Sequence, residues 1–118
     1  MHDTADQPAR LSITHATTAG VRVLGLSGEI DADNADILRQ ALGAADGASS
    51  QTVLDLSAVT FIDSSAISVL ATAHREAAAA GGRLRMAALT APVARVVGIV
   101  GLDTIIPCYP TLTEALAA

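Results

Sequence analysis

The chain has 118 residues, enough for one small domain, and 51% of them are apolar, so it can bury a core. It holds 25 alanines but only one Phe, one Tyr and no Trp, so that core must be aliphatic. The chain has twelve acidic and seven basic residues, and its net charge of −5 argues against nucleic-acid binding. All seven basic residues are arginine, which excludes lysine-based catalysis. The single Cys108 permits neither an internal disulfide nor a multi-cysteine metal site.

The beginning of the chain is polar and acidic. Residues 1–10 show no apolar period, so we expect a flexible N-terminal tail, unlike a signal peptide. The most apolar later stretch, Val96 to Leu102, is far shorter than the roughly 20 residues that cross a bilayer. We therefore expect one domain over residues 11–118, soluble and cytoplasmic, with no membrane contact.

The first predicted elements form a hairpin and a helix. Alternating apolar residues predict strands over 11–16 and 21–26, joined by a turn at 18–20 and ended by Ser27-Gly28. A helix follows and ends between Gly43 and Gly47. Its candidate N-caps are Asp31, Asp33 and Asn34, and its apolar residues at helical spacing are Ile37, Leu38, Ala41 and Leu42.

The middle of the chain predicts a buried strand that leads into a long helix. Val53 to Leu56, apolar except for Asp55, is typical of a buried strand, and Val59 to Ile62 continues toward a strand end. The trio 63–65, Asp-Ser-Ser, is typical of a helix start, and Gly81-Gly82 ends the helix. Its apolar face carries Ile67, Leu70 and Ala71.

Two further strand–helix pairs complete the pattern. A fourth strand is expected over 83–88 and a short fifth over 105–109, where Pro107 favours a sheet edge. A capping box over 111–114 opens a last helix. The helix between the strands has Thr90 as its cap and Pro92 in its first turn, with Val93, Val96, Val97 and Val100 facing inward.

The order of these elements is β-β-α-β-α-β-α-β-α. After the hairpin, strands alternate with helices, which demands right-handed crossovers and a mainly parallel sheet. The fold class is therefore α/β, with a mixed sheet of about five strands and about four helices.

Several patterns resemble sites but lack the required residues. Residues 31–42 resemble a calcium loop without its glycine and its final glutamate, so acidic helix-start residues are the better interpretation. In a helix, His74 would lie about 15 Å along the axis from Ser64, too far to act as its base. Cys108 is expected to be inert core, with redox sensing as the minor alternative. No metal and no cofactor are expected.

The junction at Asp63-Ser64-Ser65 allows two interpretations. It can be only a capped helix N-terminus, which needs no function. Alternatively, Ser64 lies at the carboxyl end of a parallel strand, where α/β sheets present their sites, and at a helix N-terminus that tolerates an anion. A phosphate there would add about −1.5 to −2 charges to the surface while leaving the fold intact. Local sequence alone leaves both interpretations open.

Taken together, the motifs over residues 11–118 resemble a STAS domain, and specifically the bacterial anti-sigma-factor antagonists. Leu26 to Asp31 matches the family's G-E-[LI]-D element, and Val53 to Ser65 matches its central signature. Gly81-Gly82, Ala91-Pro92-Val93 and Val100-Gly101-Leu102 follow in family order. The resemblance implies the STAS fold and a protein that acts by binding rather than as an enzyme.

The resemblance also implies a switch. Ser64 would be phosphorylated by an anti-sigma factor that is a serine kinase, and Ser65 is the secondary candidate. The unphosphorylated form would bind this kinase and release the sigma factor in a stress response, and a phosphatase would restore it. Asp31 and Asp63 would help to engage the kinase. Ala66 stands where the family usually has Gly, and its methyl group could restrict the approach of the kinase backbone.

Two alternatives remain open. The chain could be a STAS subunit of another assembly, such as a partner of a lipid-transport ATPase or a stressosome-like scaffold, although the intact Asp63-Ser64-Ser65 disfavours this. An enzyme or small-molecule-binding module using the same strand ends is weaker, because no base lies within reach of Ser64. Monomer is the default expectation.

Overall fold

The computed structural model describes residues 10–43 and 51–118. Within them the chain forms five strands and four α-helices in the predicted order. The strands are β1 (Ser12–Thr18), β2 (Val21–Ile30), β3 (Gln51–Ile62), β4 (Arg83–Ala87) and β5 (Cys108–Tyr109). The helices are α1 (Ala35–Gly43), α2 (Ser64–Ala79), α3 (Ala91–Val100) and α4 (Leu112–Ala117), with a short 3-10 helix η2 (Leu102–Thr104). Of the predicted tail, all but Arg10 lies outside the described residues.

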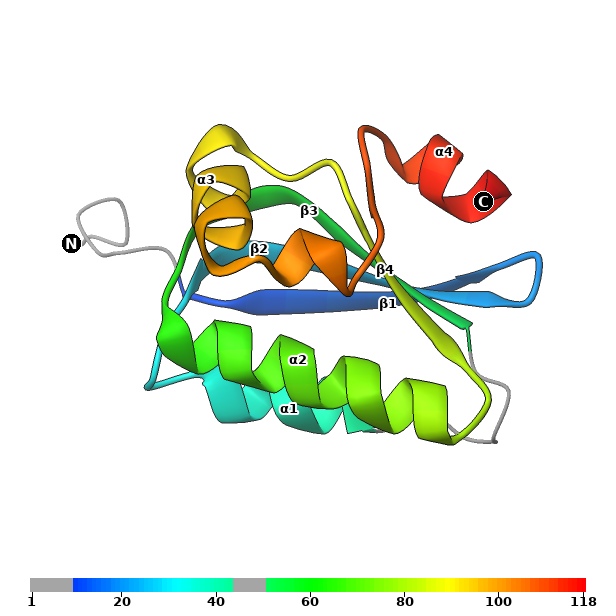
Figure 1. The fold of residues 1–118 in the computed structure, drawn as a ribbon, viewed down its shortest axis with the longest axis horizontal. Helices are drawn as coiled ribbons and strands as arrows, with labels where there is room; N and C mark the ends of the chain where they lie inside the picture. Colours follow the sequence, from blue (N-terminus) through cyan, green and yellow to red (C-terminus); the bar gives the residue numbers. More distant parts are fainter. Residues whose placement is uncertain (1–9, 44–50) are drawn as a thin grey trace, which may run out of the picture.

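The strands form one sheet in the order β1-β2-β3-β4-β5. β1 pairs with β2 antiparallel, and every other neighbouring pair is parallel, as the α/β pattern predicts. In Figure 1, α1 and α2 lie side by side below the sheet, whereas α3 and α4 lie above it. The strand order follows the chain order, so each connection after the hairpin joins neighbouring parallel strands.

The core is aliphatic, as the composition requires. Its main cluster includes Leu24 and Leu54 from the sheet with Leu38 and Leu70 from α1 and α2. A second, smaller cluster joins Val53, Ala87 and Ala115, and holds α4 on the sheet. Burial of such side chains, worth roughly 1.5–3 kcal/mol each, orients both helix layers.

β2 is longer than the alternation predicts. The two-residue turn Ala19-Gly20 has positive φ angles of 50° and 81°, which matches the twist of the hairpin. β2 then continues through Ser27 and Gly28 to Ile30, so the expected strand end at Ser27-Gly28 is wrong. Register shifts at Gly25/Ser27 and Gly28/Glu29 let it stay paired with β3.

The predicted fifth strand is also wrong in its extent. Only Cys108 and Tyr109 pair with β4, because Ile105 and Ile106 follow directly from the 3-10 helix. β5 is an edge strand, in agreement with the preference expected from Pro107. Cys108 is exposed, so its expected place in the core is wrong.

Three side chains on the helices differ from expectation. Ile37 and Val100 are each 53% exposed, because both lie on helix faces that turn away from the sheet. Thr90 occupies the N-cap position of α3 but makes no capping bond; its hydroxyl donates to the Val59 carbonyl at 2.6 Å instead. Thr90 therefore joins the start of α3 to β3.

Candidate functional site

The ends of β2 and β3 bring the predicted site residues onto one edge of the sheet. Ile30 and Ile62 are register partners in parallel strands, and Asp31 and Asp63 are the next residues of each. The Asp63 N–H donates to the Ile30 carbonyl at 3.2 Å, which links the two connections directly. We call residues 29–31 and 61–66 the carboxyl edge. It forms one surface from two segments whose nearest residues, 31 and 61, are 30 positions apart in the chain.

Asp63 is the N-cap of α2. It has extended backbone angles, and its carboxylate accepts hydrogen bonds from the Ser65 N–H at 2.9 Å and the Ala66 N–H at 3.3 Å. Two of the N–H groups that a helix leaves unbonded at its start are satisfied in this way, as the sequence predicts. The cap fixes the orientation of the first turn of α2.

The first three residues of α2 differ in how far they reach the surface. Ser64 is exposed and Ser65 is partly buried, whereas Ala66 is completely buried in the main core cluster. The methyl group of Ala66 therefore faces the core. The expectation that it restricts the approach of a partner is wrong, because a partner at the surface cannot reach it. Of the two hydroxyl groups, that of Ser64 is the more accessible to another protein.

The connection from β2 to α1 is held by the side chain of Asn34, which the sequence indicates only as a candidate helix cap. Asn34 accepts a hydrogen bond from the Asp31 N–H and donates one to the Glu29 carbonyl, both at 2.9 Å. One oxygen of Asp31 accepts from the Asp33 N–H at 3.0 Å. None of these side chains bonds the first turn of α1. An Asx turn, in which the Asp31 side chain accepts from the Asp33 N–H, is the local signal that could have indicated this network.

The structure gives no support to the hydrolase or metal patterns. His74 lies on α2 ten residues after Ser64, so the two are about 15 Å apart along the helix axis. Within residues 10–43 and 51–118, no group of three or more His, Cys, Asp or Glu could hold a metal ion. None of the helices described there is both long and apolar enough to span a membrane.

The opposite edge of the sheet carries arginines that bond to helix C-termini. Arg22 on β2 donates to the carbonyls of Ala41 and Leu42 at 2.8 and 2.9 Å, and so caps α1. Arg85 on β4 is only 2% exposed and donates to the carbonyls of Ala115 and Ala118, which fixes α4. Burial lowers the pKa of both guanidinium groups. The sequence contains no local signal for these long-range contacts.

Comparisons with known proteins agree with this fold. The family model of the STAS domain matches residues 12–115. The anti-sigma-F factor antagonist RsfB of Mycobacterium tuberculosis is 34% identical over 111 residues, which covers 92% of this chain and 89% of RsfB.

Two solved structures extend the comparison. An anti-sigma factor antagonist from Mycobacterium paratuberculosis superposes with a TM-score of 0.84 at 35% identity, over 94% of this chain and 95% of that one. The Bacillus cell fate determinant SpoIIAA in its phosphorylated form has a TM-score of 0.66 at 21% identity, over 90% and 97%. The latter shows the shared fold alone. The chain belongs to the STAS domain family, with the anti-sigma-factor antagonists as its relatives.

Proposed function

We propose that this protein is an anti-sigma-factor antagonist whose binding is switched by phosphorylation of Ser64. The unphosphorylated chain, acting as a monomer in the cytoplasm, binds an anti-sigma factor that is also a serine kinase, and so releases a sigma factor. Phosphate on Ser64 ends this binding, and a phosphatase restores it. The observation that carries the proposal is the exposed Ser64 at the start of α2, directly after the capping Asp63, in a chain related to anti-sigma-factor antagonists.

The geometry around Ser64 supports a modification that leaves the fold intact. The Ser65 and Ala66 N–H groups already donate to Asp63, so the cap does not depend on the Ser64 hydroxyl. An anion on the first residue of a helix is also favoured by the helix dipole, by about 0.3–1 kcal/mol. Phosphorylation would therefore change the surface charge without a conformational change.

The surrounding charges explain how such a phosphate would end binding. Asp31 and Asp63 already make the carboxyl edge acidic, and a phosphate adds about −1.5 to −2 charges beside them. A partner that accepts this edge would then meet like-charge repulsion and a larger desolvation cost. A loss of about 1.4 kcal/mol in binding free energy weakens the affinity tenfold. Ser65 is the secondary acceptor, with a less accessible hydroxyl.

Affinity capture from lysate of the native host tests the proposal. The baits are the wild type, Ser64→Ala and Ser64→Asp, and mass spectrometry identifies the retained proteins. We expect the wild type and Ser64→Ala to retain an anti-sigma factor with a kinase fold, and Ser64→Asp to lose it. The endogenous protein should also carry phosphate on Ser64.

Thr113→Asp is a matched control, because Thr113 is exposed and also lies in the first turn of a helix, α4. It should bind like the wild type. Capture of the same transporter or scaffold proteins by every bait, with Ser64 never phosphorylated, would contradict the proposal. Asp63-Ser64-Ser65 would then be only a helix cap, and the chain a subunit of another STAS assembly.

A further inference from the structure

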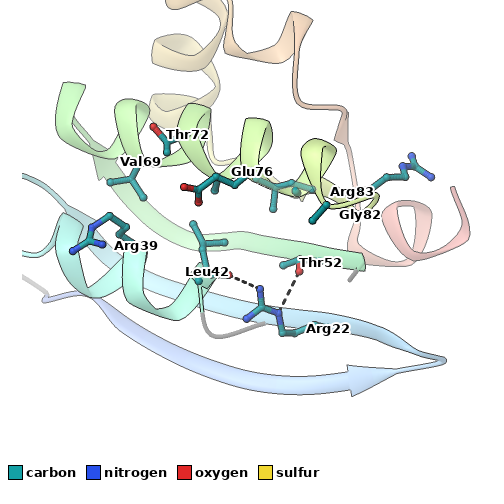
Figure 2. A pocket seen from close by; sticks show the side chains of 14 residues that line it. Arg22, Arg39, Leu42, Thr52, Val69, Thr72, Glu76, Gly82 and Arg83 are labelled. Atoms are coloured by element: carbon teal, nitrogen blue, oxygen red, sulfur yellow. Dashed lines mark hydrogen bonds between the residues drawn. The ribbon is translucent and has the colours of Figure 1, made fainter. Parts of the chain in front are cut away.

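A groove between the C-terminal halves of α1 and α2 has no role in the proposed switch. Its volume is about 290 Å³, close to the lower limit of small-molecule pockets. It lies toward the end of α2 that is opposite Ser64 and is bordered by β2, β3 and β4 (Figure 2). A ligand there would not contact the carboxyl edge.

The charges along the groove are mainly positive. Among the described residues that line it, Arg22, Arg39 and Arg83 are basic and Glu76 is acidic, and Arg39 is ion-paired with Asp36. Figure 2 shows Arg22 reaching from β2 toward the end of α1, with Glu76 on α2 and with Arg39 and Arg83 nearer the two ends of the groove. Such an excess is unusual in a chain with a net charge of −5. The groove therefore favours a negatively charged ligand.

Arg22 is the guanidinium best placed to bind that charge. Its described hydrogen bonds are all to neutral oxygens: the Thr52 hydroxyl at 3.2 Å and the carbonyls of Ala41 and Leu42. These bonds use three of the five N–H groups of an arginine. They hold the group in place, and burial lowers its pKa, which a nearby anion would offset.

The remaining wall of the groove is mainly apolar, with Thr72 as a polar exception. Leu42 and Leu84 contribute from α1 and β4, and Val69, Ala73 and Ala77 contribute from α2. Inorganic phosphate alone would leave this surface exposed to water. We propose that the groove binds a small organic anion: a carboxylate on a compact apolar body, with the carboxylate at Arg22 and the body against α2.

Benzoate, its neutral isostere benzamide, and inorganic phosphate are the probes. Amide chemical shifts of Thr72, Ala73 and Ala77 are followed by NMR during each titration of the whole chain. We expect benzoate to saturate with a Kd of roughly 1 mM, and benzamide and phosphate to bind at least about tenfold more weakly. Equal affinity for benzamide, tighter binding of phosphate than of benzoate, or no saturation by benzoate would overturn the proposal.

Two variants test the charge and the space separately, and neither removes the Arg22 contacts that hold α1. Glu76→Gln should tighten benzoate binding about twofold or more, because it removes the negative charge of Glu76 from the groove. Ala77→Leu fills the groove and should abolish binding, whereas Ala79→Leu, at an exposed position on the same helix outside the groove, should not. Weaker binding by Glu76→Gln, or unchanged binding by a folded Ala77→Leu, would overturn the assignment.

Discussion

The two edges of the sheet use opposite charges for the same physical purpose. At the carboxyl edge, the Asp63 carboxylate accepts N–H bonds at the start of α2. At the other edge, Arg22 and Arg85 donate to carbonyls at the ends of α1 and α4. Both arrangements match the helix dipole, which is positive at the N-terminus and negative at the C-terminus. They differ in burial: Arg85 is enclosed by the protein, whereas Ser64 beside Asp63 is open to solvent.

This difference separates stability from recognition. The arginines connect elements that are distant in sequence, so their loss should destabilise the fold. The hydrogen bonds of the carboxyl edge lie within the connection after β2, within the connection after β3, or between these two connections. The outer surface of this edge remains available to a partner. Substitutions at the two edges should therefore have different consequences. Three predictions test this contrast, and a fourth tests the same electrostatic reasoning outside both edges.

The largest effect on stability is expected at Arg85. Arg85→Met keeps the aliphatic stem but leaves carbonyls of α4 without their charged donor, and should lower the free energy of unfolding by about 2 kcal/mol. Urea unfolding followed by circular dichroism measures the change. Arg83→Met, the same substitution at an exposed position of β4, should stay within about 0.5 kcal/mol of the wild type. Equal losses of stability in the two variants would contradict the structural role of Arg85.

The next effect separates the charge of Asp63 from its capping bonds. Asp63→Ala should cost about 1 kcal/mol of stability, because the Ser65 and Ala66 N–H groups lose their acceptor. Asp63→Asn keeps an acceptor and should cost only a few tenths, since Asn caps as well as Asp. Both are measured by urea unfolding. If Asp63→Asn were as unstable as Asp63→Ala, the carboxyl edge would need its charge for folding.

Ser64 should show an effect of the opposite sign. Ser64→Asp places an acidic group in the first turn of α2 and should raise the free energy of unfolding by about 0.3–1 kcal/mol, while it abolishes capture of the partner. Thermal unfolding at low salt is the most sensitive measurement, because salt screens this interaction. A variant that lost both stability and binding would mean that Ser64→Asp acts by unfolding the edge.

The smallest effect is expected in the alkylation rate of the Cys108 thiol, which tests the electrostatic reasoning outside both edges. Partial burial of the thiol, and then Asp103, raise its pKa above the ordinary value. Less thiolate is therefore present at pH 7–8, and alkylation by iodoacetamide should be slower than in the urea-unfolded chain. Asp103→Asn should lower the pKa and speed the reaction. Alkylation of the folded protein as fast as that of the unfolded chain would contradict a raised thiol pKa.

Most of the fold could be predicted because its signals are local. Period-two and helical patterns, Asp63 as a cap and Gly81-Gly82 as a helix end gave the element order and the class. The predictions are wrong where tertiary contacts determine the extent of a strand or the burial of a side chain. Gly28 is typical of a strand end, but its positive φ of 95° lies within β2, where the strand irregularly pairs with β3. Ile37 fits a helical period and yet is exposed, because the apolar stripe of α1 is narrower than its sequence suggests.

The candidate site was predictable only in part for the same reason. Asp63 and Ser64 are adjacent in sequence, so their helix-start geometry follows from local rules. The bond from the Asp63 N–H to the Ile30 carbonyl joins residues 33 positions apart, and no spacing rule shows it. The burial of Ala66 likewise depends on how α2 rotates onto the core. The residues of the proposed site could be named from the sequence, but not the surface that they share.

The most direct test of the central claim is phosphorylation by the captured anti-sigma factor. The wild type, Ser64→Ala and Ser65→Ala are incubated with that protein and ATP, and intact-mass spectrometry counts the phosphates on each. We expect one phosphate on the wild type and on Ser65→Ala, and none on Ser64→Ala. No phosphate on the wild type, or a phosphate that persists on Ser64→Ala and disappears from Ser65→Ala, would contradict it.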